Sequence, residues 1–411
     1  MSLLVRLLPG FFGSSRLDAS MWAGLVGLYI AQAIPMYLVI AALPPILRSQ
    51  GVDLSVIGGV VLLALPKILK PLWAPYIDRL SRHERIGRKG IVLCTQSIVL
   101  LAIVAASQLD PVADLGILLS LLMVTAFALS TQNIATDGYA VEHLPVAHQA
   151  AGTAVQSGAA AVGVLVGGSG SLLLYDAFGW EIAVLSIGLV SFASVSLFLT
   201  VPEALGKRDA ADIHQKPSLR QFFNRSGALA ILAFALIFRL PEGAIRALEQ
   251  PFLVDAGLSL SMIGVVTGGS AAVVGLLGAY LGMVVIRRFG LVAFFITFVV
   301  ARSLVLAAFG AAAMYGLPHE ILIVLSVTST FLRYVGLVGV FTTFMRYASL
   351  SQAGTDFTVL SSATLLIYMT GSVASGVAAQ AADYAIVFWL ACGVSIITGS
   401  IAIRLLKRVN F

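Results

Sequence analysis

Four ionisable side chains share one face of a helix that lies inside a long apolar run. They are spaced three, four and three residues apart: Arg239, Glu242, Arg246 and Glu249. At about 100° per residue they fall within an arc of roughly 80°. The flanks, Ala-Ile-Leu-Ala-Phe-Ala-Leu-Ile-Phe before and Phe-Leu-Val after, are apolar. Charged groups at membrane depth are costly and usually face a cavity or a partner along a substrate or ion path. The spacing therefore predicts a helix that forms the wall of a transport pathway.

Further cationic side chains lie at membrane depth. Lys67 is about 18 Å from the outer end of its span near residue 55, close to the bilayer midplane. Arg302 and Arg333 also lie in apolar runs. This positive excess suits an anionic cargo that carries carboxylate or phenolate groups. Polar side chains that could add substrate contacts, with ordinary packing as the alternative for each, are Tyr29, Gln32 and Tyr368.

Two carboxylic acids are candidates for proton coupling. Glu242 leads, because burial favours its protonated form while a neighbouring Arg239 or Arg246 favours the ionised form. A change of partner during transport would switch Glu242 between the two forms. The alternative is a permanent structural Arg–Glu pair. Asp137, four residues after Asn133 on the same helical face, is the second candidate.

The composition excludes an ordinary soluble domain. Of 411 residues, 59% are hydrophobic and 11% are charged, whereas soluble domains carry about 25% charged residues. Backbone groups in lipid must be satisfied within a segment, so the class is an all-α polytopic membrane protein. The net charge of +6 fits basic loops at the cytoplasmic face better than nucleic-acid binding. The two cysteines lie far apart and the five histidines show no ligand spacing, so we expect no metal site and no cofactor.

About twelve apolar runs are long enough to cross a bilayer. Lys and Arg concentrate in the even connections and at both ends, which predicts that both termini are cytoplasmic. The predicted spans are 22–46, 55–77, 90–108, 114–139, 150–174, 181–200, 227–252, 260–286, 291–313, 320–345, 354–380 and 384–405.

An internal repeat divides the chain. Pro35 matches Pro241, and Gly51 matches Gly257, both at an offset of 206 residues (241 − 35 and 257 − 51). The repeat predicts an N-terminal six-helix half (1–200), a basic cytoplasmic linker (201–226) and a C-terminal six-helix half (227–411) in parallel orientation. Prolines break the backbone ladder of a helix, and broken helices mark sites at repeat interfaces. Pro35 and Pro241 are therefore predicted to help in gating.

The loop after the second span carries a family signature. Asp78-Arg79, followed after an insertion by Gly87-Arg88-Lys89, resembles the loop signature of the major facilitators in a stretched form. In that family the acidic and basic residues latch the cytoplasmic side between helices. The resemblance implies gating roles for Asp78, Arg79, Arg88 and Lys89, with membrane topology alone as the alternative for the arginines.

A second pair of motifs narrows the resemblance. L-P-K-I-L-K-P-L-W-A-P-Y-I-D-R (65–79) and T-Q-N-I-A-T-D-G-Y-A-V-E-H-L-P (131–145) resemble the major facilitator branch that contains AmpG-type muropeptide permeases, acetyl-coenzyme A transporters and RhtX/FptX siderophore importers. Muropeptide permeases usually have Asp at the position of Asn133. AmpG-type permeases resemble a fourteen-helix layout, and residues 201–226 are too short and polar for two extra spans. The compact layout therefore resembles the siderophore importers.

The resemblance implies a monomeric symporter of the bacterial inner membrane. It would import a ferric siderophore from periplasm to cytoplasm by alternating access, driven by protons and without an ATPase partner. The alternatives are an AmpG-like permease for anhydromuropeptides and another small-molecule carrier. A membrane enzyme is disfavoured, because the chain has no H-E-x-x-H, G-x-S-x-G or paired-His motif. A receptor that does not transport is a further alternative.

Overall fold

The computed structural model is all-helical over residues 19–53, 59–83, 85–199, 201, 216–266 and 270–409, which are the residues that it describes. Within them nine helices are long and apolar enough to cross a membrane, or ten if the bent pair Gly59–Leu72 and Ala74–Leu80 is one span. Two of these helices each join two spans end to end, at Gly179 and at Gly290, where φ is 80°. Dividing both there gives twelve segments in the described part of the chain. The predicted all-α polytopic class is confirmed.

The chain forms two compact units, Met1–Leu219 with Ala348–Thr358, and Arg220–Tyr347 with Val359–Phe411. We call them unit 1 and unit 2. They differ from the predicted halves at the boundary and in residues 348–358, so the division into six-helix halves stays a prediction. The N-terminal tail, the start of the second predicted span (54–58) and most of the linker (202–215) lie outside the described residues.

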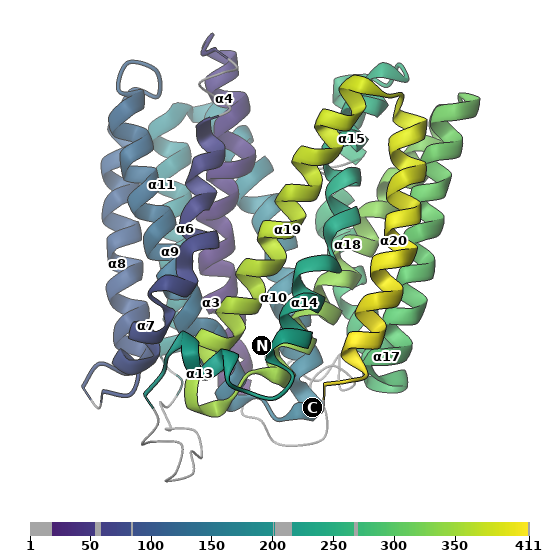
Figure 1. Ribbon diagram of the computed structural model, residues 1–411. Helices are drawn as coiled ribbons and strands as arrows, with labels where there is room; N and C mark the ends of the chain where they lie inside the picture. Colours follow the sequence, from purple (N-terminus) through teal and green to yellow (C-terminus); the bar gives the residue numbers. More distant parts are fainter. Residues whose placement is uncertain are drawn as a thin grey trace. The chain divides into compact units, whose positions relative to one another are not determined.

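Unit 1 is built around its first helix. In Figure 1 α8, α9 and α11 run side by side, and α3 packs against α10 and α11. The helices of unit 1 are α3 (Ala19–Tyr37), the π-helical turn η1 (Leu38–Ala42), α4 (Leu43–Ser49), the 3₁₀ turn η2 (Gly59–Ala64), α6 (Leu65–Leu69), the 3₁₀ turn η3 (Lys70–Leu72), α7 (Ala74–Leu80), α8 (Gly87–Ser107), α9 (Leu115–His143), α10 (Val146–Gly163), the π-helical turn η4 (Val164–Gly170), α11 (Ser171–Leu199) and the 3₁₀ turn η6 (Leu350–Gln352).

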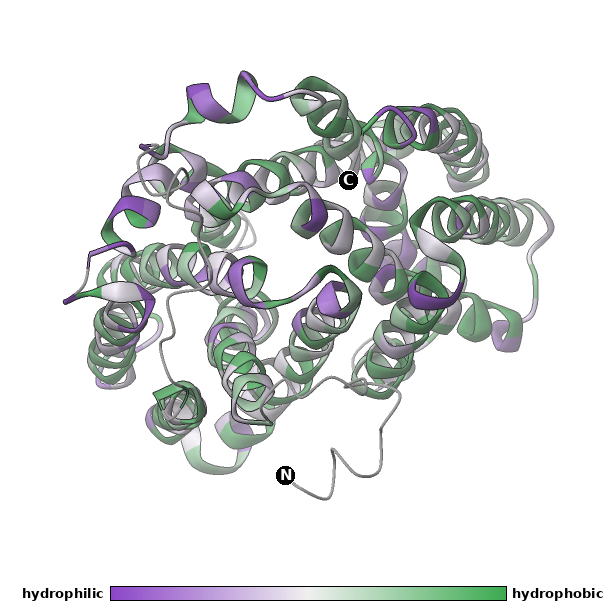
Figure 2. Ribbon diagram, turned by 90° about the horizontal axis from the view of Figure 1, so that it is seen from below, coloured by the Kyte–Doolittle hydropathy of each residue, from purple (hydrophilic) through white to green (hydrophobic). Residues whose placement is uncertain are grey.

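Unit 2 is arranged around the long helix α17, which lies beside α18 and α20 (Figure 1). Along the helices of each unit hydrophobic residues cover most of the walls, and hydrophilic residues gather at the turns (Figure 2). A short helix, α13 (Leu219–Phe223), crosses the boundary between the units, and α19 begins in unit 1 and continues in unit 2. The other helices are α14 (Ala228–Ile237), α15 (Leu240–Asp255), α16 (Leu260–Gly264), α17 (Ser270–Tyr315), α18 (His319–Tyr347), α19 (Ala353–Ala381) and α20 (Tyr384–Leu406).

The matched prolines interrupt the α-helical hydrogen bonding in the first span of each repeat. Near each proline, a side chain from another helix donates to a backbone carbonyl. Pro35 lies inside α3, two residues before the π-helical turn η1 begins. Proline cannot bond the carbonyl four residues earlier, and the Ser191 hydroxyl donates to that carbonyl, of Ala31, at 2.7 Å. Pro241 is the second residue of α15, and Arg302 donates to the carbonyl of Phe238, just before that helix, at 2.7 Å.

The repeat is also visible where each broken span ends. Gly51 and Gly257, which match at the same sequence offset, have φ of 84° and 90°. A residue in the left-handed conformation ends a helix by turning the chain away from the helix axis. Glycine adopts this conformation without strain because it has no Cβ.

Close helix contacts rest on glycines inside each unit. A Cβ at Gly167 would collide with the carbonyl of Ile34 on α3, and one at Gly243 would collide with the backbone of α19 at Ser372. The first span of each repeat is thus held near backbone contact with another helix of its own unit.

Candidate functional site

The first polar centre lies in unit 1 and surrounds a fully buried carboxylate. The Oδ1 atom of Asp137, on α9, accepts hydrogen bonds from the Tyr29 hydroxyl on α3 at 3.2 Å and from Gln156 Nε2 on α10 at 3.0 Å. Its Oδ2 atom is buried without a hydrogen bond to any residue that the structure describes. Three helices therefore meet at one carboxylate that keeps an acceptor in reserve. We call Asp137, Tyr29 and Gln156 the Asp137 centre.

A chain of polar side chains continues from this centre. Lys70, nearly fully buried, donates to Asn133 Oδ1 at 2.6 Å, and Asn133 donates to Gln32 Oε1 at 3.1 Å. Gln32 in turn donates to the Thr136 hydroxyl at 2.7 Å. Lys67 is half-buried, and its positive charge and that of Lys70 act on Asp137. The structure therefore brings together Tyr29, Gln32, Lys67 and Asp137, all singled out from the sequence, places the buried Lys70 beside them, and adds Gln156.

The second polar centre lies in unit 2 and is a buried ion triad. Glu242 Oε2 is 2.6 Å from Arg239 Nε, and Glu242 Oε1 is 3.6 Å from the Arg302 NH1 nitrogen. Arg302 also donates to the Ser395 hydroxyl at 3.0 Å. The Arg239 guanidinium lies over the ring of Tyr368, 4.6 Å from its centroid. We call Arg239, Glu242 and Arg302 the Glu242 centre. Tyr368 lies next to this centre.

The remaining charged residues of the sequence-predicted face lie further along α15. Arg246 is exposed, and Glu249 packs against α18. Glu249 accepts hydrogen bonds from the hydroxyls of Ser326 and Ser329, the second at 2.9 Å. The charges of Arg246 and half-buried Arg333 act on Glu249. The four charged residues of the face thus divide into a buried ion pair and a second group built on Glu249.

Asp78 holds the first turn of α19. Its carboxylate accepts hydrogen bonds from the Gly354 amide at 3.2 Å, the Thr355 amide at 2.6 Å and the Thr355 hydroxyl at 2.7 Å. A carboxylate at a helix N-terminus satisfies unpaired amides and meets the positive end of the helix dipole. Asp78 is also 3.3 Å from Arg88.

Arg88 ties this carboxylate to α9. Its guanidinium donates to both oxygens of Glu142, at 2.9 and 2.6 Å, and to the carbonyl of Ala135 at 3.3 Å. A Cβ at Gly138 would collide with the guanidinium, so glycine is needed there for the side chain to pass. We call Asp78, Arg88 and Glu142 the basal network.

The other two basic residues of the loop signature contact backbone carbonyls. Arg79 donates twice to Pro217, at 3.1 and 2.8 Å, and Lys89 donates to Leu199 at 3.0 Å. Within the signature Asp78 and Arg88 are therefore buried, whereas Arg79 and Lys89 are more exposed and bind backbone carbonyls.

Sequence reasoning missed several partners. Glu142 belongs to the basal network and Thr355 donates to its Asp78, and neither was singled out from the sequence. Gln156, Ser326 and Ser329 were not singled out. The two serines are three residues apart in an apolar helix, a spacing that could have indicated a shared hydrogen-bonding partner.

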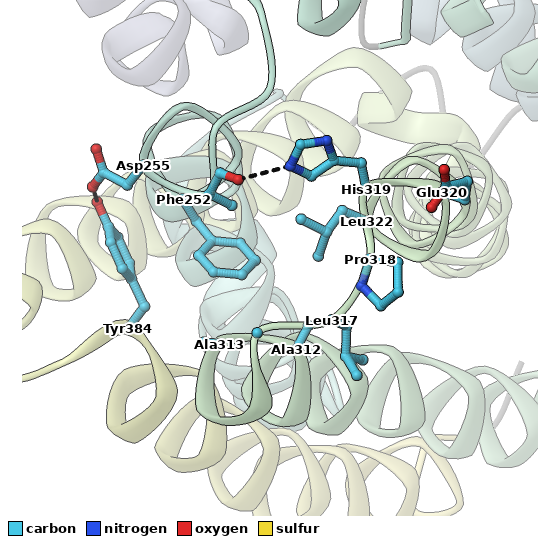
Figure 3. A pocket seen from close by; sticks show the side chains of 12 residues that line it. Phe252, Asp255, Ala312, Ala313, Leu317, Pro318, His319, Glu320, Leu322 and Tyr384 are labelled. Atoms are coloured by element: carbon cyan, nitrogen blue, oxygen red, sulfur yellow. Dashed lines mark hydrogen bonds between the residues drawn. The ribbon is translucent and has the colours of Figure 1, made fainter.

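A pocket of ≈ 610 Å³ opens at the far end of α15 in unit 2 (Figure 3). Residue 255 is about 20 Å from residue 242 along that helix, at 1.5 Å per residue. In the pocket wall the Tyr384 hydroxyl donates to Asp255 at 2.6 Å, and His319 Nε2 lies 2.9 Å from the carbonyl of Ala256. The pocket is therefore a separate feature from the Glu242 centre.

Comparison with known families and proteins gives consistent matches. The family model described as Major Facilitator Superfamily matches residues 25–351. "Putative transporter AmpG 4" of Rickettsia conorii is 24% identical over 360 residues, which cover 84% of this chain and 87% of the relative. The anhydromuropeptide permease of Escherichia coli K12 is 27% identical over 266 residues, 64% of this chain and 54% of the relative.

Solved structures share the fold. The human organic anion transporter MFSD10 superposes with a TM-score of 0.71 at 18% identity, covering 94% of this chain and 100% of that one. The proton:xylose symporter XylE gives a TM-score of 0.70 at 14% identity, with coverage of 93% and 94%. At such identities the likeness concerns the fold alone.

Proposed function

The chain belongs to the Major Facilitator Superfamily, and we propose that it is a secondary transporter of the bacterial inner membrane that imports an anionic organic solute. Members of such a fold carry a solute between two access states. The observation that carries the charge preference is the excess of cations at membrane depth, where Lys67, Lys70, Arg239 and Arg302 face the carboxylates Asp137 and Glu242. A surface potential of that sign raises the local concentration of an anion.

An anhydromuropeptide is the first candidate cargo. Its peptide and sugar acids carry carboxylates, which Arg and Lys bind with charge-assisted hydrogen bonds. Support comes from the relatives, which bear AmpG and anhydromuropeptide permease names. One AmpG-named relative aligns with this chain over 87% of its own length, so a compact chain is compatible with that cargo.

A ferric siderophore is the second candidate. The chain spans 54% of the Escherichia coli permease, and the compact layout is the feature that resembles siderophore importers. Carboxylate or phenolate groups of the chelate would meet the same cations.

We assign the proton to Asp137 ahead of Glu242. Both oxygens of Glu242 lie within 4 Å of an arginine, so each oxygen has a close counter-ion. Asp137 is bonded by two neutral donors. Its Oδ2 and the Oε1 of Glu242 are both buried without a hydrogen bond to the described residues, but only the Glu242 oxygen lies within ion-pair distance of an arginine, at 3.6 Å from Arg302. The Glu242 centre then has the structural role that the sequence left as its alternative.

For gating we propose that the basal network fixes the start of α19 and releases it when access changes. Breaking the Asp78 bonds to Gly354 and Thr355 would free the amides of that turn. Pro35 and Pro241 supply the breaks at which the first spans bend. The cytoplasmic placement of both termini and the monomeric state stay predictions, which reporter fusions and light scattering would check.

Uptake measurements test the function. Cells with and without the gene are given a radiolabelled anhydromuropeptide, and in parallel ⁵⁵Fe-labelled siderophores of different chemistry, each with and without a protonophore. Uptake of the muropeptide that needs the gene and fails with the protonophore supports the first cargo and proton coupling. The same pattern for one siderophore alone would replace the first candidate with the second. Uptake of neither, repeated in vesicles, would overturn the assignment to an anionic cargo.

A further inference from the structure

A groove on unit 2 has the dimensions and charge of a lipid site. It lies between α20 and the second span of α17, which run side by side, and encloses ≈ 670 Å³. Its wall is mostly apolar, and the twelve described residues that line it include none that is acidic. The residues on which the argument depends are Ile296, Val300, Leu304, Ile396, Arg404 and Lys407.

The apolar part of the groove faces outward from the unit. Val300 and Leu304 on α17 are 56% and 65% exposed, and Ile396 on α20 is 52% exposed. In a helix that crosses a membrane such side chains meet acyl chains rather than water. Gly399 brings the two helices together at the floor, since a Cβ there would lie 2.6 Å from the Val299 side chain.

The two basic residues lie at one end of the groove. Arg404 and Lys407 are three residues apart, so they project from one face of the last turns of α20. Both are exposed. The opposite end is formed by Ser303 and Cys392, whose thiol donates to the Ser303 carbonyl at 3.3 Å.

The length of the groove matches one leaflet. Residues 392 to 404 extend about 18 Å along α20, and half of a bilayer hydrocarbon core is about 15 Å. An acyl chain that begins at the basic end therefore reaches the inner end near Cys392. Basic pockets between transmembrane helices hold acidic headgroups.

We propose that this groove binds one anionic phospholipid, with an acyl chain along Val300, Leu304 and Ile396 and the headgroup phosphate between Arg404 and Lys407. Its inner end adjoins the Glu242 centre, because Ser303 follows Arg302 and the Ser303 and Ser395 hydroxyls lie 2.9 Å apart. Ser395 also accepts a hydrogen bond from Arg302. A lipid that binds only the folded chain stabilises it. Bound lipid should therefore raise the melting temperature of unit 2, which holds the Glu242 centre.

Native mass spectrometry of the purified full-length chain in detergent tests the proposal. Phosphatidylglycerol and phosphatidylethanolamine with identical acyl chains are titrated into the natural chain and into the double variant Arg404→Gln/Lys407→Gln. We expect the natural chain to prefer phosphatidylglycerol. We expect the double variant to bind it roughly thirtyfold more weakly, as two basic residues at a membrane surface predict, with phosphatidylethanolamine binding unchanged.

The matched control is Arg287→Gln/Arg288→Gln, which removes the same charge from unit 2 outside the residues that line the groove. It should leave phosphatidylglycerol binding within about twofold. Val300→Trp, which fills the groove from an exposed position, should weaken binding of both lipids without changing the charge, and it serves if the first variant does not fold. Equal affinity of the natural chain for both lipids, or an equal loss in the control variant, would overturn the proposal.

Discussion

Asp137 is buried beside the first span of its repeat and Glu242 is buried within the first span of its own, and the two carboxylates have different partners. Asp137 is bonded by a phenol and an amide, with lysine charges acting from further away. Glu242 is bonded by one arginine and lies within ion-pair distance of a second. A close counter-ion offsets the cost of burying a charge, whereas neutral donors leave a buried charge without a counter-ion beside it. This difference in partners is our reason for proposing Asp137 as the coupling residue and Glu242 as a structural one.

The largest expected effect is on accumulation. Asp137→Asn should abolish proton-driven accumulation of the cargo, about a hundredfold or more, because the amide cannot take up a proton. Exchange of labelled for unlabelled cargo should persist, because Tyr29 and Gln156 can still bond the side chain. Uptake and counterflow in the same vesicles measure both. Normal accumulation by Asp137→Asn, or loss of accumulation only in Glu242→Gln, would reverse the two assignments.

The next effect is on folding stability. Arg302→Met leaves Glu242 with one counter-ion and removes the donor to the Phe238 carbonyl, and breaking a buried pair costs about 3–5 kcal/mol. Thermal unfolding in detergent measures it. Asp137→Asn is the comparison in unit 1 and should cost about 1 kcal/mol, because its neutral donors keep a partner. A double variant, Glu242→Gln/Arg302→Met, should lose less than the sum of its parts. If the losses in unfolding free energy of the two single variants simply add in the double variant, Glu242 and Arg302 are not a coupled pair, and the proposed difference from the Asp137 centre is wrong.

The sequence predicted those features that depend on local spacing. The three-residue interval of Arg239 and Glu242 becomes an ion pair, and the prolines at matched offset become breaks in the first spans. Apolar run length predicted the class and twelve segments. Each of these follows from residues less than a few turns apart, where helix geometry fixes the distances.

The partners from distant helices could not be predicted in the same way. Arg302 reaches Glu242 from a helix sixty residues later (302 − 242), and Gln156 reaches Asp137 from the next span. Which side of an apolar helix faces a neighbour depends on its rotation, and a helix that is hydrophobic all round has no polar stripe to indicate it. Its position in an apolar run predicted that Arg302 lies at membrane depth but indicated no partner for it.

A smaller effect is expected from a substitution that disturbs the packing of α9 but leaves the hydrogen bonds of Asp137 in place. Gly138→Ala places a Cβ against the Arg88 guanidinium and should cost about 1–3 kcal/mol by overpacking. Transport should slow while its protonophore sensitivity remains, because Asp137 keeps its donors. Gly116→Ala, on the same helix with open space around it, is the control and should stabilise by up to about 1 kcal/mol. Unfolding and initial uptake rates are measured for both. Equal behaviour of the two variants would contradict the tight fit at Arg88.

The smallest effect concerns Asp110, an exposed carboxylate in a turn, which can be compared with the buried carboxylates Asp137 and Glu242. Backbone amides of Ala113 and Val112 donate to Asp110 and lower the pKa of that carboxyl. Its stabilising contribution is therefore present above the unfolded value of about 4 and is lost as the pH falls through the lowered folded value. Asp110→Asn should be slightly less stable than the natural chain at pH 7 and equally stable in strong acid. Melting curves across that range check this, and a difference that grows in acid would reverse the sign.

The glycine connections at Gly179 and Gly290 have a mechanical consequence. Each joins two membrane-spanning segments through a single left-handed residue, so there is no slack chain between them. Because only one non-helical residue separates the two segments, we expect a rotation of one segment to move the next one with it. A glycine-serine insertion at either position is expected to uncouple the pair, whereas the same insertion in the longer turn around Val112 should have a smaller effect, because several residues already separate the two helices there. If the transport that we propose proceeds by alternating access, the helices joined at Gly179 and at Gly290 are expected to move as pairs.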